Sequence, residues 1–170
     1  MDRLNFRILS YNRVAAVAYA LKWAFGRNPR FYDYSDLGGD CSNFASQCLL
    51  AGGAVMNFEP DYGWYYLDPN RKSPSWTGVE FLYRFLVANQ GLGPYGVPMD
   101  VIGLQPGDLI QLSFEPGKFG HTLVITGIKP PAALNRIYIS THSPNAANVQ
   151  LTSAYSWKSI RGIHITGIRG

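Results

Sequence analysis

The sequence predicts an α+β fold in which N-terminal helices pack against an antiparallel sheet. Between residues 10 and 89, apolar residues recur at helical spacing. From residue 109 onward the pattern changes to short segments rich in β-branched and aromatic residues, separated by turn signals. Helices followed by a run of strands are typical of this class. The length fits a single domain, residues 1–170.

Composition excludes several function classes. A hydrophobic content of 46% with 15% charged residues indicates a folded globular protein. The net charge is +4 without a dense Lys/Arg run, so we expect no nucleic-acid partner. No apolar stretch approaches the roughly 20 residues of a membrane span, and residues 1–10 lack an apolar signal core. The sequence leaves the compartment open between the cytoplasm and a domain cut from a secreted or cell-wall protein.

Three helices are expected in the first half of the chain. The first covers residues 10–25 and ends before Asn28-Pro29. The second begins at Cys41 and ends at Gly52-Gly53. The third begins near residue 75, where Thr77 to Glu80 matches a capping box, and it ends by residues 89–91.

Cys41 stands at the start of its helix, directly after Asp40. We expect the Asp40 carboxylate to cap the helix by accepting from N–H groups of the first turn. The positive end of the helix dipole should then favour a thiolate at Cys41. Cys48 follows seven residues later, about 10 Å along a helix, too far for a disulfide, so two free thiols are predicted. There is no C-x-x-C and the three histidines are scattered, so we expect no metal and no cofactor.

The segment from Phe58 to Ser75 is rich in Tyr, Trp and Pro and has no clear periodicity. A loop of this length either covers a site or packs on the outside of the fold. We expect it to lie over the groove at Cys41, with Trp64 in contact with the substrate. A linker punctuated by Gly and Pro then leads to Pro106-Gly107.

Four strands are expected in the second half, with a hairpin tip at residues 115–118. They are Leu109–Phe114, His121–Ile128, Arg136–Thr141 and Gly162–Ile168.

A helix-start cysteine followed about 80 residues later by a strand-start histidine is the pattern that carries chemistry. An imidazole within hydrogen-bond reach converts a thiol into a nucleophile, and a third polar group then fixes the imidazole. His142 and Asn145 follow the next strand and are both candidates for that group. We favour His142, because a hairpin would bring the end of that strand beside His121.

Several motifs, in this order, resemble the putative amidase domain family, a branch of the papain-like cysteine hydrolases related to the NlpC-type and CHAP amidases. The motifs that carry the resemblance are Tyr11-Asn12-Arg13, Gly39-Asp40-Cys41-Ser42-Asn43-Phe44-Ala45-Ser46-Gln47, Ala51-Gly52-Gly53, Ser75-Trp76-Thr77, Leu104-Gln105-Pro106-Gly107-Asp108 and Gly120-His121. The resemblance implies a papain-like fold and a cysteine hydrolase that cleaves an amide bond. It maps Cys41 to the nucleophile, His121 to the base and His142 to the third residue.

The remaining candidates surround this constellation. The Cys41 N–H should donate to the oxyanion, joined by a side chain from Tyr32, Tyr34 or Ser35, among which the sequence does not choose. Four residues are candidate substrate contacts: Tyr34, Asn43, Trp64 and Trp76. For Asn43 and Trp76, the alternatives are holding a neighbouring loop and fixing a helix.

The leading hypothesis is therefore a cysteine amidase or endopeptidase whose partner is a peptide or peptidoglycan-type amide. A non-catalytic binding module that kept only the groove is the alternative from another class. An acyltransferase or deamidase on the same scaffold would use the same nucleophile with a different acceptor for the thioester.

Overall fold

A computed structural model describes residues 5–170 as an α+β domain built around a seven-stranded antiparallel sheet. Strand order is β1-β9-β5-β6-β7-β8, and β4 also pairs with β9. The helices are α1 (Arg13–Trp23), α2 (Cys41–Ala51), α3 (Pro74–Thr77), α4 (Val79–Ala88) and α5 (Leu151–Ala154). The sheet strands are β1 (Ile8–Leu9), β4 (Gly93–Met99), β5 (Leu109–Glu115), β6 (Lys118–Ile128), β7 (Ile137–Thr141), β8 (Ala146–Gln150) and β9 (Ser159–Arg169).

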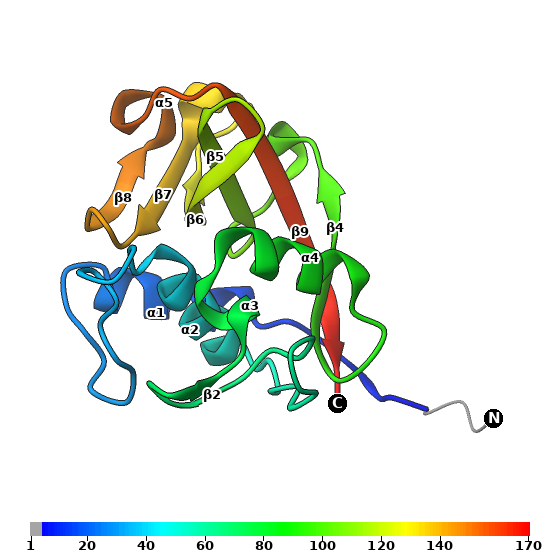
Figure 1. Ribbon diagram of the computed structural model, residues 1–170. Coiled ribbons are helices and arrows are strands. Elements are labelled where there is room, and N and C mark those ends of the chain that lie inside the picture. The colour runs from blue at the N-terminus through cyan, green and yellow to red at the C-terminus, as the bar shows by residue number, and fades with distance from the viewer. Residues whose placement is uncertain (1–4) are drawn as a thin grey trace.

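The helices α1, α2 and α4 gather on one side of the strongly twisted sheet (Figure 1). One hydrophobic core lies between these helices and the sheet and includes Phe44 and Val124. A second core covers the other side, where Leu123 and Ile125 pack with Leu151 of α5. Neighbouring residues of β6 thus face opposite cores, as the pleat of a strand requires. Helices on one face and an antiparallel sheet are the architecture that the sequence predicts.

The four expected strands correspond to β5, β6, β7 and β9, whereas β1, β4 and β8 of the sheet were not expected. The segment containing β4 carries two prolines, and its partner β9 pairs with it through a register shift between Tyr95 and Gly96. Within the Tyr- and Trp-rich segment, β2 (Tyr66–Asp68) and β3 (Arg71–Lys72) form a small hairpin. Proline and short length conceal such strands from a pattern search.

Two of the three expected helix starts differ from their expected capping. In α1 the Asn12 side chain accepts from the N–H of Ala15, as an N-cap should. At α4 the N-cap is Gly78, so the capping box at Thr77–Glu80 does not form. At α2 the N-cap is Asp40, but its carboxylate makes no capping bond. That carboxylate is used elsewhere, as described below.

Candidate active site

Cys41 is the first residue of α2 and lies against the middle strand β6. The hydroxyls of Ser42 and Thr122 are 2.9 Å apart and join the helix start to the strand. Gly38 and Gly39, with φ of 92° and 107°, turn the preceding loop into the helix, a conformation that favours glycine. The helix thereby presses Cys41 against the strand residue that follows His121.

Burial raises the pKa of the Cys41 thiol above its ordinary value. The N–H groups of Thr122 and Ser42 act in the opposite direction, and the charge of Asp40 adds to the increase. Only 6% of Cys41 is exposed, so loss of hydration outweighs the helix dipole. The expectation that the helix start favours a thiolate is therefore corrected: at neutral pH this side chain is a neutral thiol.

His121 is buried in β6, and its Nε2 lies 3.1 Å from the hydroxyl of Tyr155. Its ring also packs near Phe114. Burial lowers the pKa of His121 to about 4, which keeps the imidazole neutral at pH 7. The charge of Cys41 contributes to the raised pKa of Tyr155, after burial, so Tyr155 lies within electrostatic range of the thiol. Within residues 5–170 no hydrogen bond joins the Cys41 sulfur to His121.

His142 does not form the expected hydrogen bond to His121 and bonds to other groups among the described residues. His142 Nδ1 donates to Asp40 Oδ2 at 2.6 Å, and its ring packs against Phe44 of α2. Its Nε2 lies 2.8 Å from the Trp23 carbonyl oxygen. Both ring nitrogens of His142 are therefore occupied by groups other than His121.

Asp40 is completely buried and accepts three hydrogen bonds. The donors are His142 Nδ1, the N–H of Tyr34 at 2.8 Å and Asn43 Nδ2 at 2.8 Å. The bond to His142 connects residues 102 positions apart. The carboxylate therefore ties the Tyr34 loop, the start of α2 and the end of β7 together in place of capping the helix.

Arg27 covers this pair from the loop after α1. Its Nη1 lies 3.1 Å from His142 Nε2, and its Nη2 donates to Asn145 Oδ1 at 2.9 Å. Asn145, the other candidate for the third catalytic position, thus faces Arg27. The contact of Arg27 with His142 could not be predicted from the sequence, because Arg27 belongs to no motif and a single arginine in a loop does not indicate its partner.

Three of the four candidate substrate contacts are buried and do not line a groove. Trp64 and Trp76 are fully buried, and Asn43 is 1% exposed. Their polar atoms are already used: Trp64 donates to Ser46 Oγ at 3.0 Å, and Trp76 donates to Asn43 Oδ1 at 2.8 Å. These side chains hold the loop to α2 and cannot meet a substrate in this conformation. Trp64 is therefore part of the core, which corrects its assignment to the groove.

Tyr34, the fourth contact, is 7% exposed, and its hydroxyl lies 3.5 Å from the Pro69 carbonyl. Of the three candidate oxyanion side chains, Ser35 bonds to Asp33 at 2.5 Å and accepts from Arg27. Tyr32 is 44% exposed, and no hydrogen bond of its hydroxyl is found among residues 5–170. Tyr32 is thus the candidate whose donor is free.

Cys41 and Cys48 are both free thiols, as expected, and both are buried. In the described part of the chain, no group of three or more His, Cys, Asp or Glu side chains is arranged to hold a metal ion. None of the described helices has the length and apolarity to cross a membrane.

Alkylation should separate the two thiols. With iodoacetamide at pH 7 we expect Cys41 to react more slowly than free cysteine and to accelerate as pH rises, because only the thiolate is nucleophilic. Cys48, fully buried with a pKa raised well above its usual value, should react only after unfolding. Peptide mapping of a timed reaction measures both rates. A Cys41 rate above that of free cysteine at pH 7 would contradict a neutral thiol.

The pH dependence of stability should report on His121. An unfolded histidine takes up its proton near pH 6.5, whereas folded His121 does so near pH 4. The unfolded state therefore binds more protons in this window, and stability falls as the pH falls from 6.5 to 4, by about 3 kcal/mol in total. Urea unfolding at several pH values measures this loss. The His121→Gln variant should lose less stability than wild type over the same window; equal slopes would show that His121 does not titrate as described.

The sequence of the chain matches a known protein family. Residues 10–165 match the family described as "Putative amidase domain". The chain belongs to this amidase domain family. Membership agrees with the resemblance carried by the motifs around Cys41 and His121, and it indicates an amide hydrolase.

Two curated proteins of Bacillus subtilis (strain 168) are similar to the chain. The protein named Uncharacterized protein YhbB is 38% identical over 122 residues, which cover 70% of this chain and 38% of YhbB. Uncharacterized protein YjcM is 26% identical over 150 residues, which cover 84% of this chain and 33% of YjcM. The chain thus spans about a third of the length of these relatives. No solved structure matches it.

Proposed function

We propose that this amidase domain hydrolyses an amide bond with Cys41 as nucleophile and His121 as general base. The observation that carries the proposal is the packing of the helix-start thiol against Thr122, the neighbour of a buried, neutral histidine. A neutral imidazole has the lone pair that a base needs, and a neutral thiol has the proton to give.

The reaction begins when His121 Nδ1 takes the thiol proton as the sulfur attacks the amide carbonyl carbon. The tetrahedral intermediate collapses, the imidazolium protonates the departing amine, and a thioester remains on Cys41. Water, deprotonated by the same imidazole, then releases the acid and restores the thiol. The proton moves during attack and not beforehand, because burial disfavours both charged forms. The imidazole must close onto the sulfur when substrate binds, as catalytic hydrogen bonds often do.

Tyr155 takes the orienting role in this proposal. Its hydroxyl oxygen accepts from Nε2–H of His121 across 3.1 Å, which leaves the Nδ1 lone pair of His121 free to take a proton. His142 instead holds Asp40, the residue before the nucleophile. The oxyanion receives the Cys41 N–H and the free hydroxyl of Tyr32.

For the substrate we propose a peptide amide of the peptidoglycan type, cleaved by a papain-like enzyme related to the NlpC-type and CHAP amidases. The net charge of +4 suits an anionic cell-wall polymer. Family membership supports the amide, and the resemblance of the motifs supports the finer assignment.

Incubation with purified peptidoglycan and with muropeptides, followed by mass spectrometry, tests this proposal. The expected product gains one water at an amide, and the Cys41→Ala variant produces none. Binding without any product would favour the non-catalytic module. Products formed only with an added amine acceptor would favour an acyltransferase, and release of ammonia a deamidase.

A further inference from the structure

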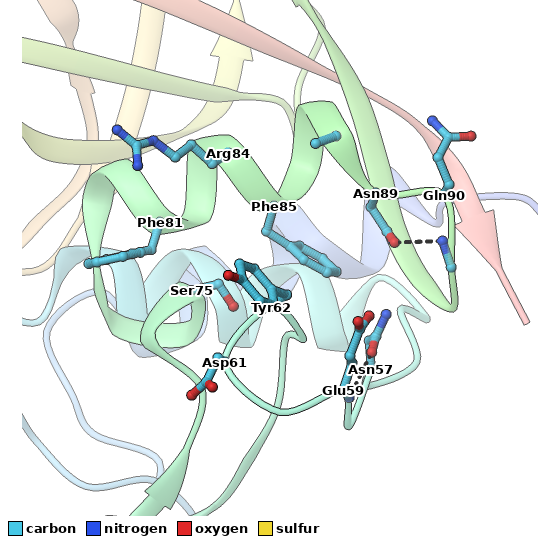
Figure 2. A pocket seen from close by; sticks show the side chains of 12 residues that line it. Asn57, Glu59, Asp61, Tyr62, Ser75, Phe81, Arg84, Phe85, Asn89 and Gln90 are labelled. Carbon is cyan, nitrogen blue, oxygen red and sulfur yellow. Dashed lines mark hydrogen bonds between the residues drawn. The ribbon is translucent and has the colours of Figure 1, made fainter.

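A hollow lies between α4 and the loop of residues 57–62, apart from Cys41. It is an open pocket of about 420 Å³. Phe81 and Phe85 come from α4, and Asp61 and Tyr62 come from the loop facing it (Figure 2). Neither Cys41 nor His121 lines it, so this pocket is not part of the proposed catalytic site. A volume of this size suits a small ligand or one or two amino-acid side chains.

Aromatic surface dominates the pocket. Phe85 is nearly buried and forms part of the core, stacked on Trp64. Phe81 is 54% exposed and Tyr62 is 80% exposed, and among residues 5–170 neither ring pairs with another aromatic ring. Two open rings beside a concave wall provide apolar area that a ligand can cover.

The charged groups at the pocket leave an excess of negative charge. In the described part of the chain, Glu59 and Asp61 enter no ion pair. The one cation that lines the pocket, Arg84, is already paired with Glu80 at 3.3 Å. The pocket is therefore lined by two carboxylates that are not paired with a cation of the described residues, although the protein as a whole has a net charge of +4. Such a site favours a cation.

The buried amide of Asn89 adds to this preference. Both of its N–H groups are used, since Nδ2 donates to the carbonyls of Leu92 and Pro94 at 3.0 Å. Among residues 5–170, its Oδ1 accepts only from the N–H of Gly91, at 2.9 Å, which leaves its second lone pair for a ligand. The amide can thus accept from a ligand but has no proton left to give.

We propose that this pocket binds a protonated primary amine carried on an apolar or aromatic body. The rings of Phe81 and Tyr62 cover the body, and the ammonium group lies near Glu59 and Asp61. Ammonium provides only donors, which complements the carboxylates and the spare lone pair of Asn89. The amine can come from a free small molecule or from a lysine side chain in a peptide.

Titration of the ¹⁵N-labelled protein followed by amide chemical shifts tests the proposal in two arms. Phenethylamine represents the free amine, and N-acetyl-Phe-Lys-amide the peptide. The matched neutral probes are phenethyl alcohol and N-acetyl-Phe-norleucine-amide. We expect saturable shifts in residues 57–62 and 81–91 from at least one amine, with binding at least tenfold tighter than its neutral partner. The arm that binds more tightly identifies the source.

Variants locate the site. Phe81→Ser should weaken binding at least tenfold, whereas Phe25→Ser, which changes another exposed phenylalanine just after the end of α1, should leave it unchanged. Asp61→Asn together with Glu59→Gln should remove the preference for the amine, and asparagine tolerates the φ of 63° at residue 61. Equal binding of amine and alcohol, shifts outside the pocket, or an unaffected Phe81→Ser would each overturn the proposal. The Cys41→Ala variant should bind as wild type does, so failure of the catalytic proposal leaves this test intact.

Discussion

Replacing His121 by alanine should reduce amide hydrolysis about a thousandfold or more. In the proposed mechanism the thiol of Cys41 is neutral, because burial raises its pKa, so its attack would depend on a base that removes the proton. Nucleophile and base act as a unit, and losing either one removes most of the rate. Turnover of a muropeptide or model amide measures the loss. The Cys41→Ala variant should be equally inactive, and the double variant should be no worse.

The Tyr155→Phe variant tests the orientation of the His121 ring separately from proton transfer by His121. It removes only the hydroxyl that meets His121 Nε2, so turnover should fall roughly ten- to a hundredfold with little change in the Michaelis constant. Tyr138→Phe removes a hydroxyl for which the described residues offer no hydrogen-bond partner and serves as the control. Retention of full activity by Tyr155→Phe would remove Tyr155 from the proposed mechanism, while a silent His121→Ala would remove the mechanism itself.

The fold class and the main elements could be predicted because they depend on local patterns. The helix of Cys41 follows from its glycine-bounded apolar spacing, and β5, β6, β7 and β9 follow from runs of β-formers. The strand β4 could not be recognised from the sequence, because its prolines argue against a strand. Its extended structure depends on the pairing with β9, which local sequence does not indicate. The capping role of Asp40 failed for a related reason: a partner 102 residues away competes for the carboxylate.

For the candidate site, the sequence could propose only residues that stand at recognisable points of a local pattern. Cys41 was proposed because it begins a helix, and His121 because it opens an expected strand, although β6 in fact begins at Lys118. His142 was assigned to His121 by strand adjacency, but both of its ring nitrogens are occupied by groups other than His121. Tyr155 follows a four-residue helix whose docking no periodicity indicates. The burial of Trp64 and Trp76 likewise depends on how the loop folds back onto α2.

Replacing His142 by alanine should destabilise the protein by about 3–5 kcal/mol, because the change removes a hydrogen-bond donor from a buried carboxylate and leaves a cavity. Asp40 and His142 are 0% and 1% exposed, and their 2.6 Å contact joins the start of α2 to the end of β7. Without the imidazole, Asp40 keeps the N–H of Tyr34 and the amide of Asn43 but loses its shortest partner. The ring also leaves a cavity against Phe44.

His164→Ala is the matched control for this prediction. His164 also donates to a buried aspartate, Asp108, but it is 20% exposed, and Asp108 keeps Arg13 at 2.7 Å. That change should therefore cost no more than about 1 kcal/mol. Urea unfolding at pH 7 measures both variants. A His142→Ala protein as stable as His164→Ala, yet inactive, would return His142 to the catalytic role that strand adjacency first indicated. A large loss of stability would show that His142 has a structural role: it holds Asp40, and with Asp40 the proposed nucleophile Cys41, against the sheet.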